Sequence, residues 1–453
     1  MAAGMMTPLP DALDRAVRKK IADHQVTWRS PSVAALVVRD GAPVHFTGVG
    51  TTEAGAASVP TDDTQYRVGS ITKTFTATLV MQCRDDGLLS LDDELGKYVP
   101  DTKHGGLSIR RMLCHFSGLQ REPHGDIWES GAGPDLSTLL SGLEQTDAVL
   151  PPGRAFHYSN LAYSLLGEVV ARLRGATWAD VLRDRILGPL GMDRTTTTAA
   201  PPRAHGYLVD PYADRVWPEP LFPGFAFAPA GELWCTPRDL GRWAAFLADP
   251  VADVLSADTL DEMCHPQAMF DLDGWLLAWG LGLMLHRRGE RVLVGHDGAM
   301  PGFVAGLAVR RPEKVGAVVF ANTSAGAEPG ELAVALTLDV VDGDPALPTA
   351  WRVGPPVAPE YEELLGRWWS EGSEFVFAVE DGKLIARRTD LPQGKPPAVF
   401  EKVTADLYRT VSGREYGELL RIVRDEQSGA VSKMYWATYP FTRRPTTFGP
   451  DPD

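Results

Sequence analysis

A proline-rich break near residue 350 divides this chain into two parts that must fold separately. Five prolines and one glycine fall between Asp344 and Glu360, and such segments are extended and semi-rigid rather than part of a packed core. The chain has 453 residues, which is more than one hydrophobic core usually holds. The sequence therefore predicts a first domain at residues 1–345, a linker at 346–359 and a second domain at 360–453.

The first part of the chain has the pattern of a mixed α+β fold. After an amphipathic helix near the N-terminus, the apolar runs Val33–Val38 and Val44–Gly48 flank an Asp-Gly pair, which is a good hairpin signal. Residues 105–250 contain helix-like stretches broken by proline and glycine, and strand-like runs return between Leu281 and Ala321. This order predicts an antiparallel sheet flanked by helices, with a separate helical subdomain.

The second part changes to short strands. Glu374–Val379 alternates polar and apolar residues, turns at Asp381-Gly382, and continues as Lys383–Ala386. Further strand-like runs are Val399–Lys402, Leu407–Arg409, Leu419–Val423 and Val431–Ala437. About 90 residues of short strands are typical of a small all-β barrel or sandwich.

Composition excludes several classes of protein. The chain is 44% hydrophobic and 23% charged, as expected for a globular protein, and its net charge is −15. A charge of that sign argues against nucleic acid or an anionic membrane as the main partner. There is no apolar stretch long enough to span a bilayer and no apolar segment typical of an export signal. We therefore expect a cytoplasmic protein.

Cysteine and histidine spacing gives no sign of a cofactor site. The four cysteines are far apart and form no Cys-x-x-Cys pair, so free and mostly buried thiols are expected. No His-Glu-x-x-His pattern, phosphate loop or dinucleotide fingerprint occurs. The sequence predicts no metal and no cofactor.

A serine three residues before a lysine, Ser70-Ile71-Thr72-Lys73, begins an apolar helical pattern that runs to Asp86. Three residues are nearly one helical turn, so both side chains share a face. A desolvated lysine there can activate the serine as a nucleophile. The motif alone also fits a helix-capping serine followed by a surface lysine.

Two further motifs favour the catalytic interpretation. Tyr158-Ser159-Asn160 follows a Pro-Pro-Gly turn; its phenol is suited to carrying a proton, and its carboxamide to holding a lysine or a substrate carbonyl. The glycine-rich run Val294–Gly302, with His296 and Gly298, follows a strand and leaves peptide N–H groups free beside it. Alone, these motifs also fit a half-buried aromatic with a helix cap, and a hairpin turn.

In this order and spacing the three motifs resemble the superfamily of penicillin-binding proteins and class C β-lactamases, which are serine acyl enzymes. The resemblance covers about residues 15 to 340 and includes the stretches 107–119 and 230–240. The third motif is His296-Asp297-Gly298 where β-lactamases have Lys-Thr-Gly. That departure is similar to the esterase, D-aminopeptidase and peptidase members, and it argues against efficient β-lactam hydrolysis. The tail resembles the lipocalin-like domains appended to some of these hydrolases.

The resemblance implies a role for each motif residue. Ser70 is the nucleophile, while Lys73 and Tyr158 move its proton as coupled groups. The backbone N–H groups of Ser70 and Ala299 form the oxyanion hole. Asn160 positions Lys73 and the substrate amide. His296 contacts the phenol or a substrate carboxylate and is expected to make activity sensitive to pH near neutrality.

Substrate contacts are predicted in three places. Gly298 lets the substrate backbone approach, and Phe225 and Phe227 lie in an aromatic, proline-rich loop that is suited to walling an apolar pocket. Near the C-terminus a guanidinium of Arg443 or Arg444 is a candidate to hold a substrate or carrier group. A packed structural loop and two solvated arginines remain the alternatives.

The absence of an export signal, the histidine motif and the C-terminal barrel together resemble the stand-alone penicillin-binding-protein-type thioesterases. That resemblance implies release of a linear nonribosomal peptide, with a D residue at its acylating end, as a head-to-tail ring. The expected partner is a peptidyl thioester, with a carrier protein of a peptide synthetase as a candidate. The alternative is a serine hydrolase (an esterase, a D-aminopeptidase or a D-amino-acid amidase), and a sensor without turnover is a third hypothesis.

Overall fold

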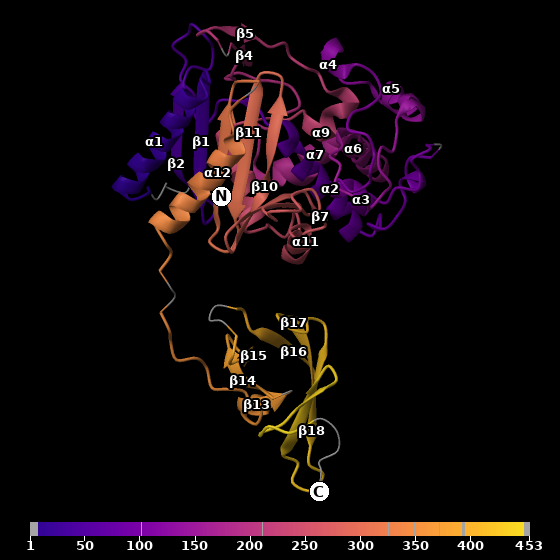
Figure 1. Cartoon of the computed structure of the whole chain (residues 1–453), viewed down its shortest axis with the longest axis vertical. Coiled ribbons are helices and arrows are strands. Elements are labelled where there is room, and N and C mark those ends of the chain that lie inside the picture. The colour runs from indigo at the N-terminus through magenta and orange to yellow at the C-terminus, as the bar shows by residue number, and fades with distance from the viewer. Residues whose placement is uncertain are drawn as a thin grey trace. The chain divides into compact units, whose positions relative to one another are not determined.

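The computed structural model describes residues 8–100, 102–210, 212–324, 326–347, 350–370, 372–391 and 395–447. The chain forms two compact units, Met1–Leu347 and Pro348–Asp453 (Figure 1). Residues 1–7 and 448–453, predicted at the outer ends of the two domains, and linker residues 348–349 lie outside the described residues.

An eight-stranded antiparallel sheet forms the centre of the first unit, in the order β2-β1-β12-β11-β10-β9-β8-β7. Its strands are β1 (Ser32–Arg39), β2 (Ala42–Gly50), β7 (Ala268–Met269), β8 (Leu277–Trp279), β9 (Met284–Arg288), β10 (Arg291–Met300), β11 (Phe303–Arg310) and β12 (Val315–Ala321). The predicted hairpin joins β1 to β2 at Asp40 and Gly41, which both have positive φ. Strands β1, β11 and β12 are almost completely buried because helices cover both faces.

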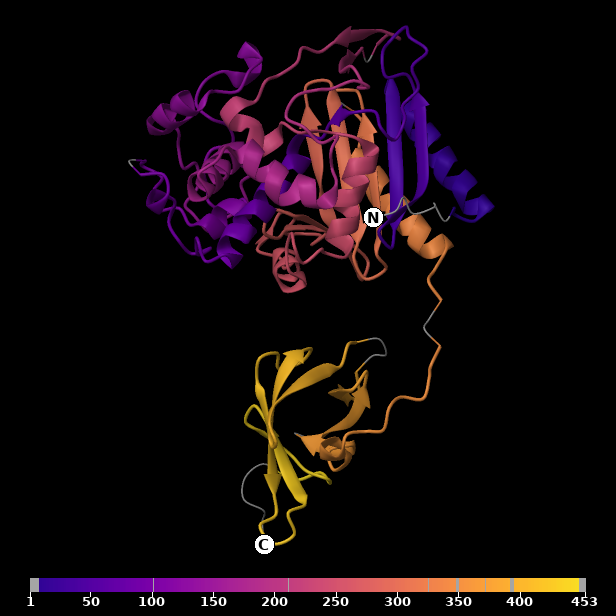
Figure 2. The same ribbon diagram turned by 180° about the vertical axis from the view of Figure 1, so that it is seen from behind.

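One face of the sheet is covered by α1 (Asp11–Thr27) and α12 (Pro329–Gly343), and Figures 1 and 2 show these helices together on one side. The other face packs against α10 (Pro237–Ala248) and the helical region. That region contains α2 (Thr72–Asp85), α3 (Ile109–Leu113), α4 (Ile127–Ser130), α5 (Leu136–Ser141), α6 (Asn160–Arg174), α7 (Trp178–Leu182), α8 (Gly188–Leu190), α9 (Ala228–Gly231) and α11 (Ala257–Met263). The predicted α+β architecture with a helical subdomain is confirmed.

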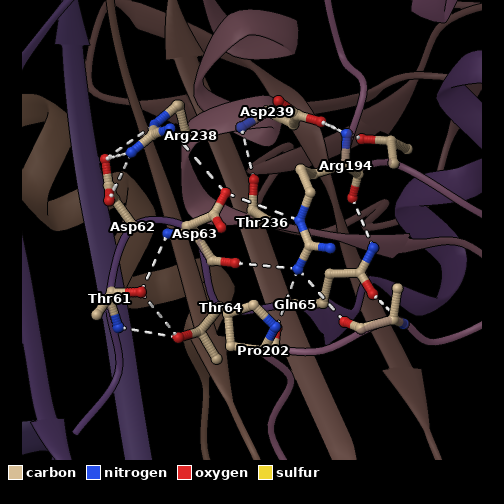
Figure 3. Close-up of polar contacts among 12 residues, drawn as sticks. Thr61, Asp62, Asp63, Thr64, Gln65, Arg194, Pro202, Thr236, Arg238 and Asp239 are labelled. Carbon is tan, nitrogen blue, oxygen red and sulfur yellow. Dashed lines mark hydrogen bonds and ion pairs between the residues drawn. The ribbon is translucent and has the colours of Figure 1, made fainter.

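The segment that leads to Ser70 is fixed by polar contacts (Figure 3). Gln65 donates from its amide nitrogen to the carbonyl of Arg194 at 2.7 Å and from its backbone to Pro202 at 2.9 Å. Asp62 accepts both arms of the Arg238 guanidinium at the start of α10. The short strand β3 (Tyr66–Arg67) then pairs with β6 (Trp234–Cys235). These contacts set the direction in which the chain enters the helical region.

Ser70 lies in the 3-10 turn η1 (Gly69–Ile71), directly before α2 begins at Thr72. Every residue of α2 from Thr72 to Cys83 is buried, as expected for a helix enclosed on all sides. The predicted helix over Ser70–Asp86 is therefore correct except for its first turn. Of the four cysteines, Cys83, Cys114 and Cys235 are buried and all four are free, as predicted.

The second unit is a nearly closed barrel of eight antiparallel strands, and the predicted all-β domain is confirmed. The strands are β13 (Gly366–Ser370), β14 (Ser373–Glu380), β15 (Lys383–Arg388), β16 (Ala398–Thr404), β17 (Leu407–Ser412), β18 (Leu419–Arg424), β19 (Val431–Trp436) and β20 (Tyr439–Phe441). Two mutual backbone hydrogen bonds between Trp369 and Thr442 join the first and last strands. The sequence did not predict β13 or β20, whose short runs lack alternation and, in β20, contain a proline.

Among the described residues, no helix is both long and apolar enough to cross a bilayer.

Candidate active site

The Ser70 and Lys73 side chains meet at the start of α2. Lys73 Nζ lies 3.1 Å from Ser70 Oγ, 2.7 Å from Asn160 Oδ1 and 2.6 Å from the carbonyl oxygen of Ala230. Lys73 is fully buried, whereas Ser70 is partly exposed and lines a cavity. The structure thus brings the predicted nucleophile and its predicted base into hydrogen-bond contact.

Burial holds the pKa of Lys73 well below its usual range, because desolvation penalises the ammonium more than the nearby Glu122 carboxylate stabilises it. A neutral amine has two N–H donors and one lone pair. The carbonyl oxygens of Asn160 and Ala230 take the two donors. The lone pair is then left for the Ser70 hydroxyl, which donates to it, and this is the arrangement that a general base requires.

Tyr158 lies beside this pair. Lys73 Nζ is 4.9 Å from the centre of the Tyr158 ring. Burial raises the pKa of Tyr158, although a hydrogen bond with the Ser70 side chain partly opposes the shift. The phenol therefore stays protonated at neutral pH and is a proton donor, while Lys73 is the acceptor.

Glu122 is a member of the site that sequence reasoning missed. Asn160 Nδ2 donates to both carboxylate oxygens of Glu122, at 2.8 and 3.1 Å. This fixes the orientation of the amide so that Asn160 Oδ1 faces Lys73. Glu122 lies just after the recognised stretch 107–119, in a segment with no motif, and no local signal in the sequence marks it.

Replacing Glu122 by glutamine is expected to move the acid limb of the pH–rate profile to lower pH. The carboxylate raises the pKa of Lys73, so its removal lowers that pKa further, and the neutral amine persists to more acidic conditions. The glutamine keeps an acceptor for Asn160, so kcat at its optimum should fall by less than about tenfold. Steady-state rates on an ester substrate from pH 4 to 9 measure this. Glu129→Gln, on the exposed side of α4, is the control, and a limb that moves to higher pH would contradict the assignment.

Glycines bring the predicted oxyanion donors together. Gly69 has φ +52°, and a Cβ there would lie 2.5 Å from the backbone nitrogen of Ala299. A Cβ on Gly298 would lie 1.8 Å from the carbonyl oxygen of Val68 and 3.2 Å from the Ser70 nitrogen. Only glycines permit β10 and η1 to approach so closely.

The Ala299 N–H points toward the cleft. The Asp297 N–H donates to Met284 Sδ on β9, away from β11, and N–H groups two residues apart on a strand point the same way. Beyond Gly295, which pairs with Met284, β10 has no paired residue on β9. The N–H of Ala299 is therefore directed to the open edge, beside Ser70.

His296 requires a correction. It is 2% exposed, and its Nδ1 donates to the carbonyl oxygen of Asp297 at 2.6 Å. Burial and the nearby Lys73 lower the pKa of His296 to about 3. It therefore stays neutral across the working pH range, and the predicted sensitivity to pH near neutrality does not arise from this residue. Its ring lies 6.3 Å from that of Tyr158.

A cavity of about 870 Å³ opens above Ser70. Six aromatic residues line part of it, namely Trp128, Phe156, Tyr158, Phe227, Phe270 and Trp279. Charged side chains also line it, among them Arg121, Glu122 and Glu331. Phe227 thus lines the site as predicted, but Phe225 does not. Its side chain is 63% exposed and borders a second groove beside Leu136 and Trp178. Trp279 belongs to a short strand without a motif, so the sequence did not reveal it.

The predicted role of Arg443 also needs correction. Its guanidinium stacks on Trp368 at 3.8 Å and donates to the carbonyl oxygens of Glu363, Leu365 and Arg367. These contacts lie within the second unit. Arg443 follows β20, and its hydrogen bonds connect that end of the chain to the start of β13. For Arg444 a substrate contact stays a prediction. No group of potential metal ligands gathers among the residues that the structure describes.

A buried lysine base on a serine, a protonated tyrosine and two backbone donors define a serine acyl-transfer or hydrolase enzyme. Comparison with known proteins agrees. The family description "Beta-lactamase" matches residues 13–342, and a domain of unknown function, DUF7586, matches residues 357–443. The chain belongs to the beta-lactamase family, and the predicted membership of the superfamily of serine β-lactamases and penicillin-binding proteins is confirmed.

Individual relatives cover different shares of the chain. D-alanyl-D-alanine-carboxypeptidase/endopeptidase AmpH of Escherichia coli (strain K12) is 28% identical over 328 residues. The match covers 67% of this chain and 83% of the length of that relative. The chain spans 57% to 83% of the length of several curated relatives. The structure of SurE is 27% identical, with a TM-score of 0.63. The match covers 96% of this chain and 99% of the SurE chain. The structure of the D-amino acid amidase of Ochrobactrum anthropi SV3, complexed with D-phenylalanine, is 25% identical, with a TM-score of 0.63. The match covers 74% of this chain and 99% of the amidase chain.

Proposed function

We propose that the protein is a serine thioesterase that releases a linear nonribosomal peptide from a thioester as a head-to-tail macrolactam. The observation that carries the proposal is the match to SurE over both units, because that match includes the C-terminal barrel as well as the catalytic unit. This two-unit arrangement is the one expected from the resemblance to the penicillin-binding-protein-type thioesterases. A carrier protein of a peptide synthetase is the proposed source of the substrate.

The catalytic geometry supports such a reaction. Ser70 Oγ attacks the thioester carbonyl, Lys73 accepts the hydroxyl proton, and the carbonyl oxygen develops its charge between the N–H groups of Ser70 and Ala299. The thiolate leaves and takes a proton through Tyr158. The amine of the peptide then attacks the acyl carbon and forms the amide bond, while the ester bond to Ser70 Oγ breaks. The proton lost by the amine passes through Lys73 and Tyr158 to Ser70 Oγ. The cavity of about 870 Å³, which aromatic side chains line in part, offers room for a bulky acyl chain.

A D residue at the acylating position is part of the proposal. A structure of SurE with D-Leu matches 96% of this chain at 26% identity. The D-amino acid amidase is similar to this chain in complexes with D-phenylalanine and with L-phenylalanine, so its ligands do not discriminate between the two configurations. The likeness to this amidase supports the second candidate, a hydrolase that uses water in place of the amine. The carboxypeptidase/endopeptidase relative supports the same candidate.

The deciding experiment supplies peptidyl thioesters that end in a D or an L residue and identifies products by mass spectrometry. A product lighter than the linear acid by one water, formed from the D substrate, is expected. The same peptide with an acetylated N-terminus cannot close a ring and should yield only linear acid. Ser70→Ala should yield neither product. Linear acid alone from the free-amine peptides would favour the hydrolase.

A further inference from the structure

His115 lies behind Tyr158, outside the cavity that holds the substrate. It directly follows α3 and Cys114, and its side chain is fully buried. Its backbone has φ +56°, a left-handed conformation that bulky residues rarely adopt and that histidine and asparagine tolerate better than most. A strained, buried histidine at this place needs an explanation, because strain persists only where surrounding contacts enforce it.

Two hydrogen bonds connect His115 to the residues on either side of Tyr158. The backbone N–H of His157 donates to the carbonyl oxygen of His115 at 2.8 Å. The backbone N–H of Ser159 donates to His115 Nδ1 at 3.1 Å. One residue thus binds the chain immediately before and immediately after the catalytic tyrosine. The left-handed backbone of His115 presents both its carbonyl and its ring to that loop.

The His115 ring also contacts the phenol ring directly. The two rings stack with centroids 4.1 Å apart and an interplanar angle of 26°. Trp279 and Phe156 meet the His115 ring edge to face at 6.0 and 5.7 Å. The plane of the Tyr158 ring is therefore set by a neighbour that is itself enclosed by other aromatic rings.

These contacts require one protonation state. Burial, with Lys73 nearby, holds the pKa of His115 well below its usual range, so the imidazole is neutral. Because Nδ1 accepts the Ser159 N–H, the ring proton is on Nε2. A protonated ring would present a second donor to that N–H and would break the contact.

We infer that His115 positions the Tyr158 phenol against Ser70 by binding both flanking peptide groups and stacking on the ring. It acts through Tyr158 and does not touch the substrate. The inference rests on the serine acyl-transfer chemistry alone, so it stands whether the acceptor is an amine or water. Misplacing a catalytic group by about 1 Å can cost about 100-fold in rate, which sets the expected size of the effect.

Two substitutions separate the two contacts. In His115→Asn the amide oxygen replaces Nδ1 as acceptor for Ser159 and tolerates the left-handed backbone, but the stack is lost. In His115→Phe the stack is kept, but the Ser159 N–H loses its acceptor. We expect kcat to fall by about tenfold in the asparagine variant and by about 100-fold in the phenylalanine variant. KM should stay within about threefold in both, because Tyr158 is the cavity residue that moves, whereas most of the lining does not contact His115.

The measurement uses the full chain and a p-nitrophenyl ester, so that its outcome is independent of any peptide substrate. His104→Asn is the matched control, since His104 is also buried in the helical region but bonds to Thr146 instead. It should lower the melting temperature without changing kcat. A kcat loss in the His115 variants that merely follows their loss of melting temperature would overturn the inference. So would wild-type kcat in folded His115→Asn, which decides the matter if His115→Phe does not fold.

Discussion

Replacing Lys73 by methionine is expected to slow the acylation of Ser70 by about 10²–10⁴-fold, the range that a general base contributes. Methionine fills nearly the same volume, but it has no basic lone pair to accept the serine proton. Substrate should still bind, because Lys73 is buried and does not line the cavity. The change should therefore appear in kcat, with KM nearly constant. Stopped-flow acylation by a chromogenic ester measures it.

An arginine at the same position tests the charge of the group. Arginine cannot be deprotonated in proteins, so Lys73→Arg should be at least as slow as Lys73→Met if the neutral amine is the active form. Lys97→Arg, on the protein surface with its partner Asp93, should leave the rate unchanged. Activity retained in Lys73→Arg would mean that the site needs a cation beside Ser70, contrary to the low pKa of Lys73.

The parts of the site that the sequence predicted are those carried by short spacing. Ser70 and Lys73 are separated by one turn of the chain, so their contact follows from backbone geometry alone. Tyr158 and Asn160 were predicted from their own short motif at the start of α6, although their contacts with Lys73 join distant segments of the chain. The hairpin at Asp40-Gly41 and most barrel strands likewise follow from local patterns.

The parts that escaped prediction depend on contacts between distant segments. Glu122 reaches Asn160 across 38 positions of sequence, and His115 reaches Ser159 across 44. Glu122 has no local pattern. His115 lies in the stretch 107–119 that contributes to the resemblance, but that stretch does not show which residue His115 faces. Phe225 and Phe227 are two positions apart in one short turn, yet they line different grooves. Arg443 was predicted to hold a substrate or carrier group, but its guanidinium bonds to backbone carbonyl oxygens at the start of the barrel.

Gly298→Ala is expected to lower kcat by about 10²–10³-fold, the cost of losing one oxyanion donor. The new Cβ would lie 1.8 Å from the carbonyl oxygen of Val68, so β10 and η1 must move apart. Val68 is two residues before Ser70, and Ala299 directly follows Gly298. The separation therefore pulls one donor away from the other. Overpacking of this kind should also destabilise the fold by about 1–3 kcal/mol.

The two consequences can be separated by a second glycine of the same strand. A Cβ on Gly295 would lie 1.8 Å from the carbonyl oxygen of Leu307 on β11, which is an equal clash directed away from Ser70. Gly295→Ala should therefore lower the melting temperature as much as Gly298→Ala does, while the folded enzyme keeps its acylation rate. An equal loss of kcat in both variants would show that general loosening of β10, and not the position of the Ala299 N–H, limits the rate. A loss confined to Gly298→Ala assigns the effect to the pair of N–H groups, because only that substitution acts on the contact between η1 and β10.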